Sequence, residues 1–189
     1  MERGFGELRI ADFDSIELSN LNRIRAGVHN LGVPKVVVVA REIAEIDPYL
    51  NVRCFGDGVT EASLQEFLLG SGRLDLLIDE CDDLDMKIRA RQRAREYRIP
   101  VLMETSDRGM IDVERFDLEP DRPIFHGLVE HLHTSNLKGL SREEKVPFVL
   151  WIIGIETMSD RMKASFLEIE QTITTWPQLA SDVVLGGAT

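Results

Sequence analysis

The sequence has 189 residues, and 22 Lys and Arg against 33 Asp and Glu give it a formal net charge of −11. Its length predicts one domain with a sizeable core, and its acidic balance argues against binding nucleic acid or an anionic membrane surface. Two cysteines, Cys54 and Cys81, are too few for a disulfide scaffold or a four-cysteine zinc site. With no signal peptide and no apolar run long enough to cross a bilayer, we expect a cytoplasmic protein.

Strands and helices alternate in the predicted secondary structure of residues 7–105. The apolar pattern predicts strands at 7–11, 51–55, 75–79 and 99–104, with helices at 34–46, 60–69 and 84–97. Residues 19–23 are polar and predict a loop or a single helical turn. Pro34 can open the first helix, where its missing N–H costs nothing, and Asp47-Pro48 ends it. Residues 75–79 are nearly all apolar, which is typical of a strand buried on both faces.

A hairpin and a helical segment follow these units. Residues 107–109 can turn the fourth strand back into residues 111–116. Ser141 and Glu144 form a capping box ahead of helices expected at 142–156 and 160–173. The pattern predicts an α/β, Rossmann-like fold with a mostly parallel sheet flanked by helices. An antiparallel hairpin is expected at one side of the sheet, followed by a helical C-terminal segment.

Two acidic residues, Asp12 and Asp82, come just after the carboxyl ends of predicted strands. Right-handed crossovers place ligands outside those ends of a parallel sheet. Asp12 and Asp82 are therefore candidates for one crevice, although they are far apart in the sequence.

Residues 12–23, Asp-Phe-Asp-Ser-Ile-Glu-Leu-Ser-Asn-Leu-Asn-Arg, form the most specific stretch of the chain. They resemble the pattern D-x-D-x-(V/I)-E-x-S-N-L-x-R-Q of the ThiF, MoeB and ubiquitin-activating enzyme family. Residues 32–35, 46–48 and 79–83 are similar, in order, to that family's G-x-P-K, I-N-P and D-x-x-D-N motifs. The resemblance covers about residues 4–116. Residues 100–128 also resemble large bacterial members that are joined to a nitroreductase-like domain.

The resemblance implies a homodimer that uses ATP and magnesium to adenylate a carboxylate, usually the C-terminus of a ubiquitin-like or sulfur-carrier protein. It implies that Asp12 holds the ribose hydroxyls, that Asn20, Arg23 and Lys35 contact phosphates, and that Asp82 helps to hold magnesium. The expected catalytic residues are Arg23, Lys35 and Asp82. Their chemistry fits, since Arg and Lys can stabilise charge on the α-phosphate. A carboxylate suits magnesium, which prefers oxygen ligands.

Each of these residues also has a structural explanation. Asp12 can simply end a strand, Arg23 can be a solvated charge, and Asp82 can belong to an acidic helix N-terminus. Lys35 is harder to explain in this way, because a cation in the first turn of a helix opposes the helix dipole and a bound phosphate would reverse the sign. Two other functions therefore stay open: a catalytically inactive scaffold or dimerisation domain, and an NAD- or FAD-binding domain of an oxidoreductase.

Several family features are missing from the sequence. It has no strand followed by G-x-G-x-x-G, no paired CxxC motif and no cysteine after Cys81, and Ile24 stands where the family has Gln. We therefore expect the chain to begin within the fold, as a truncated nucleotide-binding core at residues 1–116. Residues 117–189 are expected to complete this core or pack on it. The chain alone is expected to bind ATP weakly, to be inactive and to form no thioester.

The cysteines and histidines do not point to further chemistry. Cys54 is predicted to be a buried strand residue, and the carboxylate of Asp82 should disfavour the thiolate of Cys81. His131 and His133 invite a metal site, but without a third ligand nearby they are expected to be loop histidines.

Overall fold

The computed structural model describes residues 6–105, 107, 110–129, 140–156 and 158–173. The chain forms two compact units that divide between Phe67 and Leu68, and each unit is described by itself. His131 and His133 lie outside the described residues. A domain boundary at residue 116 stays a prediction.

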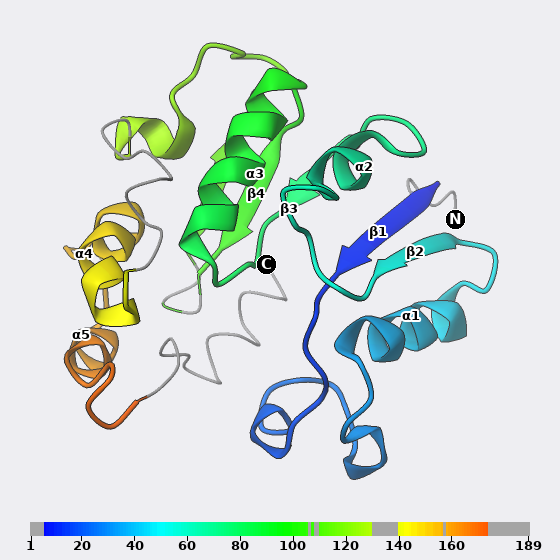
Figure 1. Cartoon of the computed structure of the whole chain (residues 1–189), viewed down its shortest axis with the longest axis horizontal. Helices are drawn as coiled ribbons and strands as arrows, with labels where there is room; N and C mark the ends of the chain where they lie inside the picture. The colour runs from blue at the N-terminus through cyan, green and yellow to red at the C-terminus, as the bar shows by residue number, and fades with distance from the viewer. Residues whose placement is uncertain (1–5, 106, 108–109, 130–139, 157, 174–189) are drawn as a thin grey trace. The chain divides into compact units, whose positions relative to one another are not determined.

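The first unit holds a two-stranded parallel sheet and one long helix (Figure 1). Its elements are β1 (Glu7–Ala11), the short 3-10 helices η1 (Leu18–Asn20) and η2 (Val28–Asn30), α1 (Lys35–Ile46), β2 (Asn51–Phe55) and the start of α2 (Leu64–Leu69). The strands pair in register from Glu7 with Asn51 to Ala11 with Phe55, and α1 packs against β2. As predicted, α1 ends before Asp47, but Pro34 is the residue before the helix and not its first residue, so α1 begins at Lys35. The side chains of Val36, Val38, Leu64 and Phe67 are buried in the core.

The second unit holds a three-stranded sheet in the order β3-β4-β5. Its elements are β3 (Leu77–Ile78), α3 (Leu84–Glu96), β4 (Val101–Glu104), β5 (Ile111–Glu114), the 3-10 helix η3 (Ile124–Gly127), α4 (Arg142–Ile153) and α5 (Asp160–Leu167). β3 pairs parallel with β4, and β4 pairs antiparallel with β5. The predicted hairpin is therefore confirmed. Asp83 caps α3 by accepting a hydrogen bond from the backbone N–H of Asp85 at 3.0 Å.

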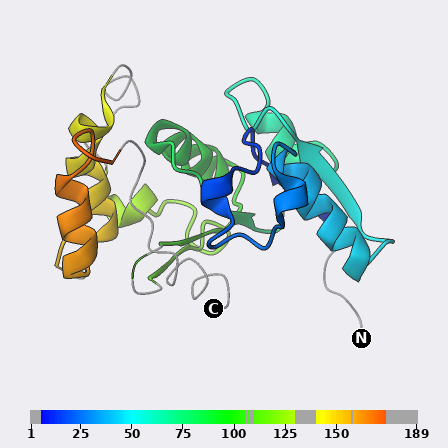
Figure 2. The ribbon, with the colours of Figure 1, turned by 90° about the horizontal axis from the view of Figure 1, so that it is seen from below.

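Helices α4 and α5 lie side by side in both views (Figures 1 and 2). Met158, Met162, Phe166 and Ile169 form a buried cluster against which side chains of α4 pack. The predicted capping box opens α4, since Ser141 accepts from Glu144 N and Glu144 accepts from Ser141 N. Both helices end earlier than predicted. Gly154 stops α4 with a φ of 83°, a conformation that favours glycine.

The structure confirms the α/β fold with a parallel sheet, flanking helices, an antiparallel strand pair and a helical C-terminal segment. Two burial predictions are wrong. Cys54 is exposed. Ile78 is 60% exposed although Leu77 is buried, because successive strand residues face opposite sides and only one side of β3 is covered. Within the described residues, no helix is long and apolar enough to cross a membrane.

Candidate functional site

The first cluster of candidate residues lies where β1 ends and α1 begins. Asp12 follows β1, and its Oδ1 accepts a hydrogen bond from Asp14 N at 2.8 Å, which turns the chain. Lys35 is the first residue of α1, and its backbone N–H donates to Asp14 O at 2.9 Å. Its ammonium lies 2.7 Å from Asp14 Oδ2 and 3.8 Å from Asp12 Oδ2. The fold therefore brings the side chains of Lys35 and Asp12 together, and their roles at a bound nucleotide stay a prediction.

The turn formed by η1 carries the other two candidates of this unit. Asn20 is buried, and its Oδ1 accepts a hydrogen bond from Glu17 N at 3.0 Å. The backbone carbonyl oxygen of Asn20 accepts hydrogen bonds from the backbone N–H groups of Arg23 and Ile24 at 3.1 and 2.9 Å. The Arg23 guanidinium is partly exposed and donates from Nη1 to Ser19 O at 3.0 Å. Asn20 therefore holds the turn that presents Arg23, and its predicted contact with phosphate stays a prediction.

Asp82 belongs to the second unit, in the turn between β3 and α3. It is exposed and lies one residue before the helix cap, since Asp83 and not Asp82 accepts from the first turn of α3. Behind this turn, Asp79 is buried and fixes the backbone by accepting from Cys81 N at 3.0 Å. Asp79 also pairs with the Lys87 ammonium at 3.1 Å and with the buried Arg91 guanidinium.

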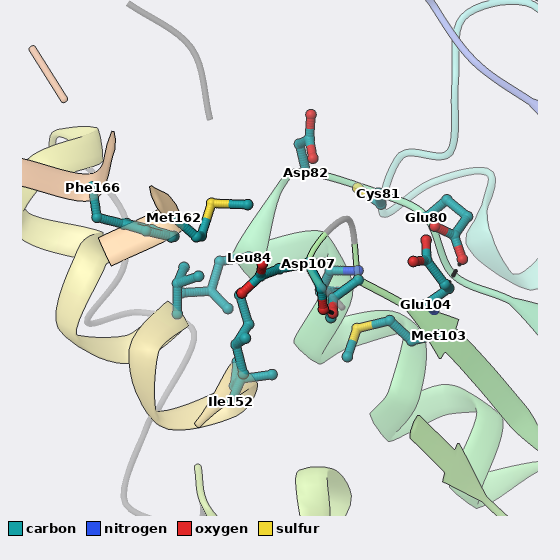
Figure 3. Close-up of a pocket in the computed structure, with 14 residues that line it drawn as sticks. Glu80, Cys81, Asp82, Leu84, Met103, Glu104, Asp107, Ile152, Met162 and Phe166 are labelled. Atoms are coloured by element: carbon teal, nitrogen blue, oxygen red, sulfur yellow. Dashed lines mark hydrogen bonds between the residues drawn. The ribbon is translucent and has the colours of Figure 1, made fainter. Parts of the chain in front are cut away.

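A pocket of about 160 Å³ opens beside Asp82 in the same unit (Figure 3). One wall consists of apolar side chains of α4 and α5, including Ile152, Met162 and Phe166. The opposite wall comes from the ends of β3 and β4 and from the residues after them. It carries the carboxylates Glu80, Asp82, Glu104 and Asp107. The pocket is therefore apolar on one side and acidic on the other.

Burial controls the titration of two groups that line this pocket. It raises the pKa of the Cys81 thiol to about 11, and nearby Asp79 adds to the rise. Burial also raises the pKa of Glu80, whose carboxylate accepts a hydrogen bond from Glu104 N at 3.1 Å. Cys81 is therefore a thiol and not a thiolate at neutral pH. This agrees with the expectation that its thiolate is disfavoured, but burial and not Asp82 is the main cause.

The sequence did not single out Glu80, Lys87 or Asp107 as site residues. A signal for Asp107 existed, because it follows the carboxyl end of a strand in the same way as Asp12 and Asp82. Among the described residues, no three His, Cys, Asp or Glu side chains are arranged to hold a metal ion. The predicted magnesium contact therefore rests on Asp82 alone.

Comparison with known proteins gives this geometry a context. The ThiF family model matches residues 1–164. The uncharacterized protein MT1398 of Mycobacterium tuberculosis is 51% identical over 188 residues, which are 100% of this chain and 26% of that protein. The molybdopterin-synthase adenylyltransferase of Haemophilus influenzae is 25% identical over 165 residues, with 85% of this chain and 66% of the enzyme covered. The crystal structure of PaaA superposes with a TM-score of 0.57 at 18% identity, over 98% of this chain and 53% of that one. This last likeness supports the fold.

Proposed function

Since the chain belongs to the ThiF family, we propose that it takes part in the ATP-dependent adenylation of a carboxylate. ATP supplies the adenylyl group in such a reaction. The Haemophilus adenylyltransferase supports this reaction class by its similarity to 85% of the chain. The proposed carboxylate is the C-terminus of a ubiquitin-like or sulfur-carrier protein, and the proposed assembly is a cytoplasmic homodimer.

The cluster at the start of α1 carries the proposal. Lys35 adds an ammonium to a helix N-terminus that already has positive potential, and both attract a phosphate. Asp12 lies 3.8 Å from that ammonium, where its carboxylate can accept hydrogen bonds from ribose hydroxyls. A cation and a hydroxyl acceptor in contact match the two halves of a ribose phosphate.

Arg23 provides a second cation for the same role. Among the described residues, both of its side-chain hydrogen bonds leave from Nη1, toward Ser19 O and Asn22 Oδ1. Nη2 is then available to a phosphate oxygen. A guanidinium and an ammonium acting on one phosphate lower the free energy of the charge that develops there when a carboxylate attacks.

Asp82 is proposed as the magnesium contact. Its side chain is exposed, so a hydrated cation can reach it, and magnesium keeps several waters when it binds to proteins. Asp79 and Lys87 hold the turn behind it. The role of these two residues is to position the Asp82 carboxylate.

ATP–pyrophosphate exchange tests the proposal, with peptides that end like ubiquitin-like or sulfur-carrier proteins as the carboxylates. Because the chain alone is expected to be inactive, the assay uses a protein extended upstream of Met1 to include a strand and a G-x-G-x-x-G loop. Lys35→Ala should slow exchange at least about tenfold, because a charge-assisted hydrogen bond contributes about 1.5–3 kcal/mol. Arg41→Ala removes an exposed cation from the same helix and should leave the rate unchanged. Asp82→Ala should abolish exchange. No exchange with any peptide would favour the scaffold alternative, and binding of NAD or FAD without ATP would favour the oxidoreductase domain.

A further inference from the structure

Asp107 is the least expected group in the pocket beside Asp82. The residue is only 5% exposed. Its Oδ2 accepts a hydrogen bond from Ser159 N, the cap of α5, at 2.8 Å. Its Oδ1 is buried, and within the described part of the chain no donor reaches it. A buried carboxylate oxygen without a donor is unfavourable, so this atom indicates a ligand that supplies one.

The charges around the pocket favour a cationic donor. Four carboxylates line it, Glu80, Asp82, Glu104 and Asp107, against the single cation Lys87. The Lys87 ammonium already lies 3.1 Å from Asp79 Oδ1, which is not part of the pocket lining. The pocket therefore keeps a negative potential that attracts a positive group and repels a carboxylate.

The opposite wall selects the shape of that group. Val149, Ile152 and Ile153 of α4 and Met162 and Phe166 of α5 form an apolar surface facing the acidic strand ends. Figure 3 shows Asp107 between these helices and the strand end that carries Met103. A hydrated metal ion does not need such a wall, and no cluster of three possible metal ligands occurs among the residues described. An ammonium or guanidinium on an apolar stem matches both walls.

We propose that this pocket binds a cationic group on an apolar stem, and that the carboxylate substrate carries this group near the carboxyl end to be activated. The second part rests on the proposed function, because Asp82 lines the pocket and is also the proposed magnesium contact. Asp107 then acts as the specificity residue of the site. Its charge pairs with the cation, while Ser159 keeps it in place.

Binding of two probes to the chain tests the pocket without any reaction. n-Pentylammonium should bind at least tenfold more tightly than its neutral analogue 1-pentanol, measured by NMR titration. Asp107→Asn retains an acceptor for Ser159 N and should reduce this preference to below threefold. Asp117→Asn, which removes a partly exposed carboxylate that is paired with Arg115 and lies outside the pocket lining, should leave the preference unchanged. If Asp107→Asn does not fold, Glu80→Gln should reduce the preference at least threefold.

Several outcomes would overturn the inference. They are no binding of either probe, equal binding of both, a preference that survives Asp107→Asn, and displacement of n-pentylammonium by equimolar magnesium chloride. Pyrophosphate exchange by the upstream-extended protein, with acetyl-Lys-Gly and acetyl-norleucyl-Gly as substrates, separates the pocket from the reaction. Exchange without a preference for the lysine peptide would overturn the substrate assignment and leave the adenylation proposal intact. Selective binding of n-pentylammonium without exchange would overturn the adenylation proposal and leave the cation pocket intact.

Discussion

Replacing Arg91 by Met should strongly destabilise the second unit, because Arg91 is the central cation of a buried network. Its side chain is completely buried. Its Nε donates to Glu114 at 2.8 Å, its Nη1 pairs with Asp79, and its guanidinium lies 4.0 Å above the ring of Phe125. The variant would leave the buried carboxylate of Glu114 without its counter-charge and would leave Asp79 with Lys87 as its cationic partner. Loss of one partner from a buried pair costs about 3–5 kcal/mol, a large part of a stability that is typically about 5–15 kcal/mol.

The destabilisation of Arg91→Met should depend on pH. Burial already raises the pKa of Glu114 above its usual value, although Arg91 opposes this. Without Arg91, the folded-state pKa of Glu114 rises further. A carboxyl group with a raised folded-state pKa stabilises the fold fully below its unfolded-state pKa, and this contribution is lost as the pH rises through the folded-state value. The deficit of the variant should therefore be largest at pH 7 and smaller near pH 5.

Urea denaturation followed by circular dichroism measures this effect. A loss of about 4 kcal/mol at a slope of about 2 kcal/mol/M lowers the midpoint by about 2 M. Arg93→Met is the matched control, since Arg93 lies on the same helix in an exposed pair with Glu96 and should change stability by less than about 0.5 kcal/mol. A loss below about 1 kcal/mol for Arg91→Met, or a loss that does not change with pH, would refute the network as a determinant of stability.

Three further predictions concern single positions. Asp14→Asn removes the carboxylate that pairs with the Lys35 ammonium. Since an exposed ion pair contributes about 0.2–1 kcal/mol, ATP binding should strengthen about two- to fivefold in titrations. Weaker binding would contradict the assignment of Lys35 as a phosphate contact. Because the pKa of Cys81 is about 11, its alkylation by iodoacetamide at pH 8 should be about a hundredfold slower than that of free cysteine. A rate equal to that of free cysteine would indicate an activated thiol. Pro147 lies inside α4, where it cannot donate a helix hydrogen bond. Pro147→Ala should therefore stabilise the chain by about 1–3 kcal/mol in thermal unfolding. A lower melting temperature would show that the proline is needed for packing.

Element boundaries were predictable because local chemistry sets them. Pro34 and Asp47 bound α1, and the reciprocal bonds of Ser141 and Glu144 open α4. Each signal acts within a few residues, so the sequence alone contains it. Other boundaries were predicted less well, since α4 and α5 end earlier than expected and α2 begins later.

Burial was harder to predict, because it depends on partners that are distant in the sequence. On β5 the acidic Glu114 is completely buried, while Ile111 and Val113 are each 44% exposed. Apolar and acidic residues clearly alternate along this strand. The acidic side is the buried one, because Arg91 of α3 pairs with Glu114 there. Helical spacing does indicate that Arg91 is buried. Arg91 follows Leu84 and Ile88 on one face of α3, and both are buried.

Some residues of the candidate site take their positions from nearby sequence, and others from partners far along the chain. Lys35 and Asp12 were predictable, since each lies directly at the end of an element whose boundary was correct. The position of Asp107 after a strand was visible in the sequence, but its burial was not, because the partner of its Oδ2 is Ser159, 52 positions later. Asn20 shows a third case, in which the motif was found but the structure gives its side chain a local partner, Glu17 N. A family motif therefore proposes the members of a site, whereas the contacts of each side chain indicate which member is placed to touch a ligand and which one positions another.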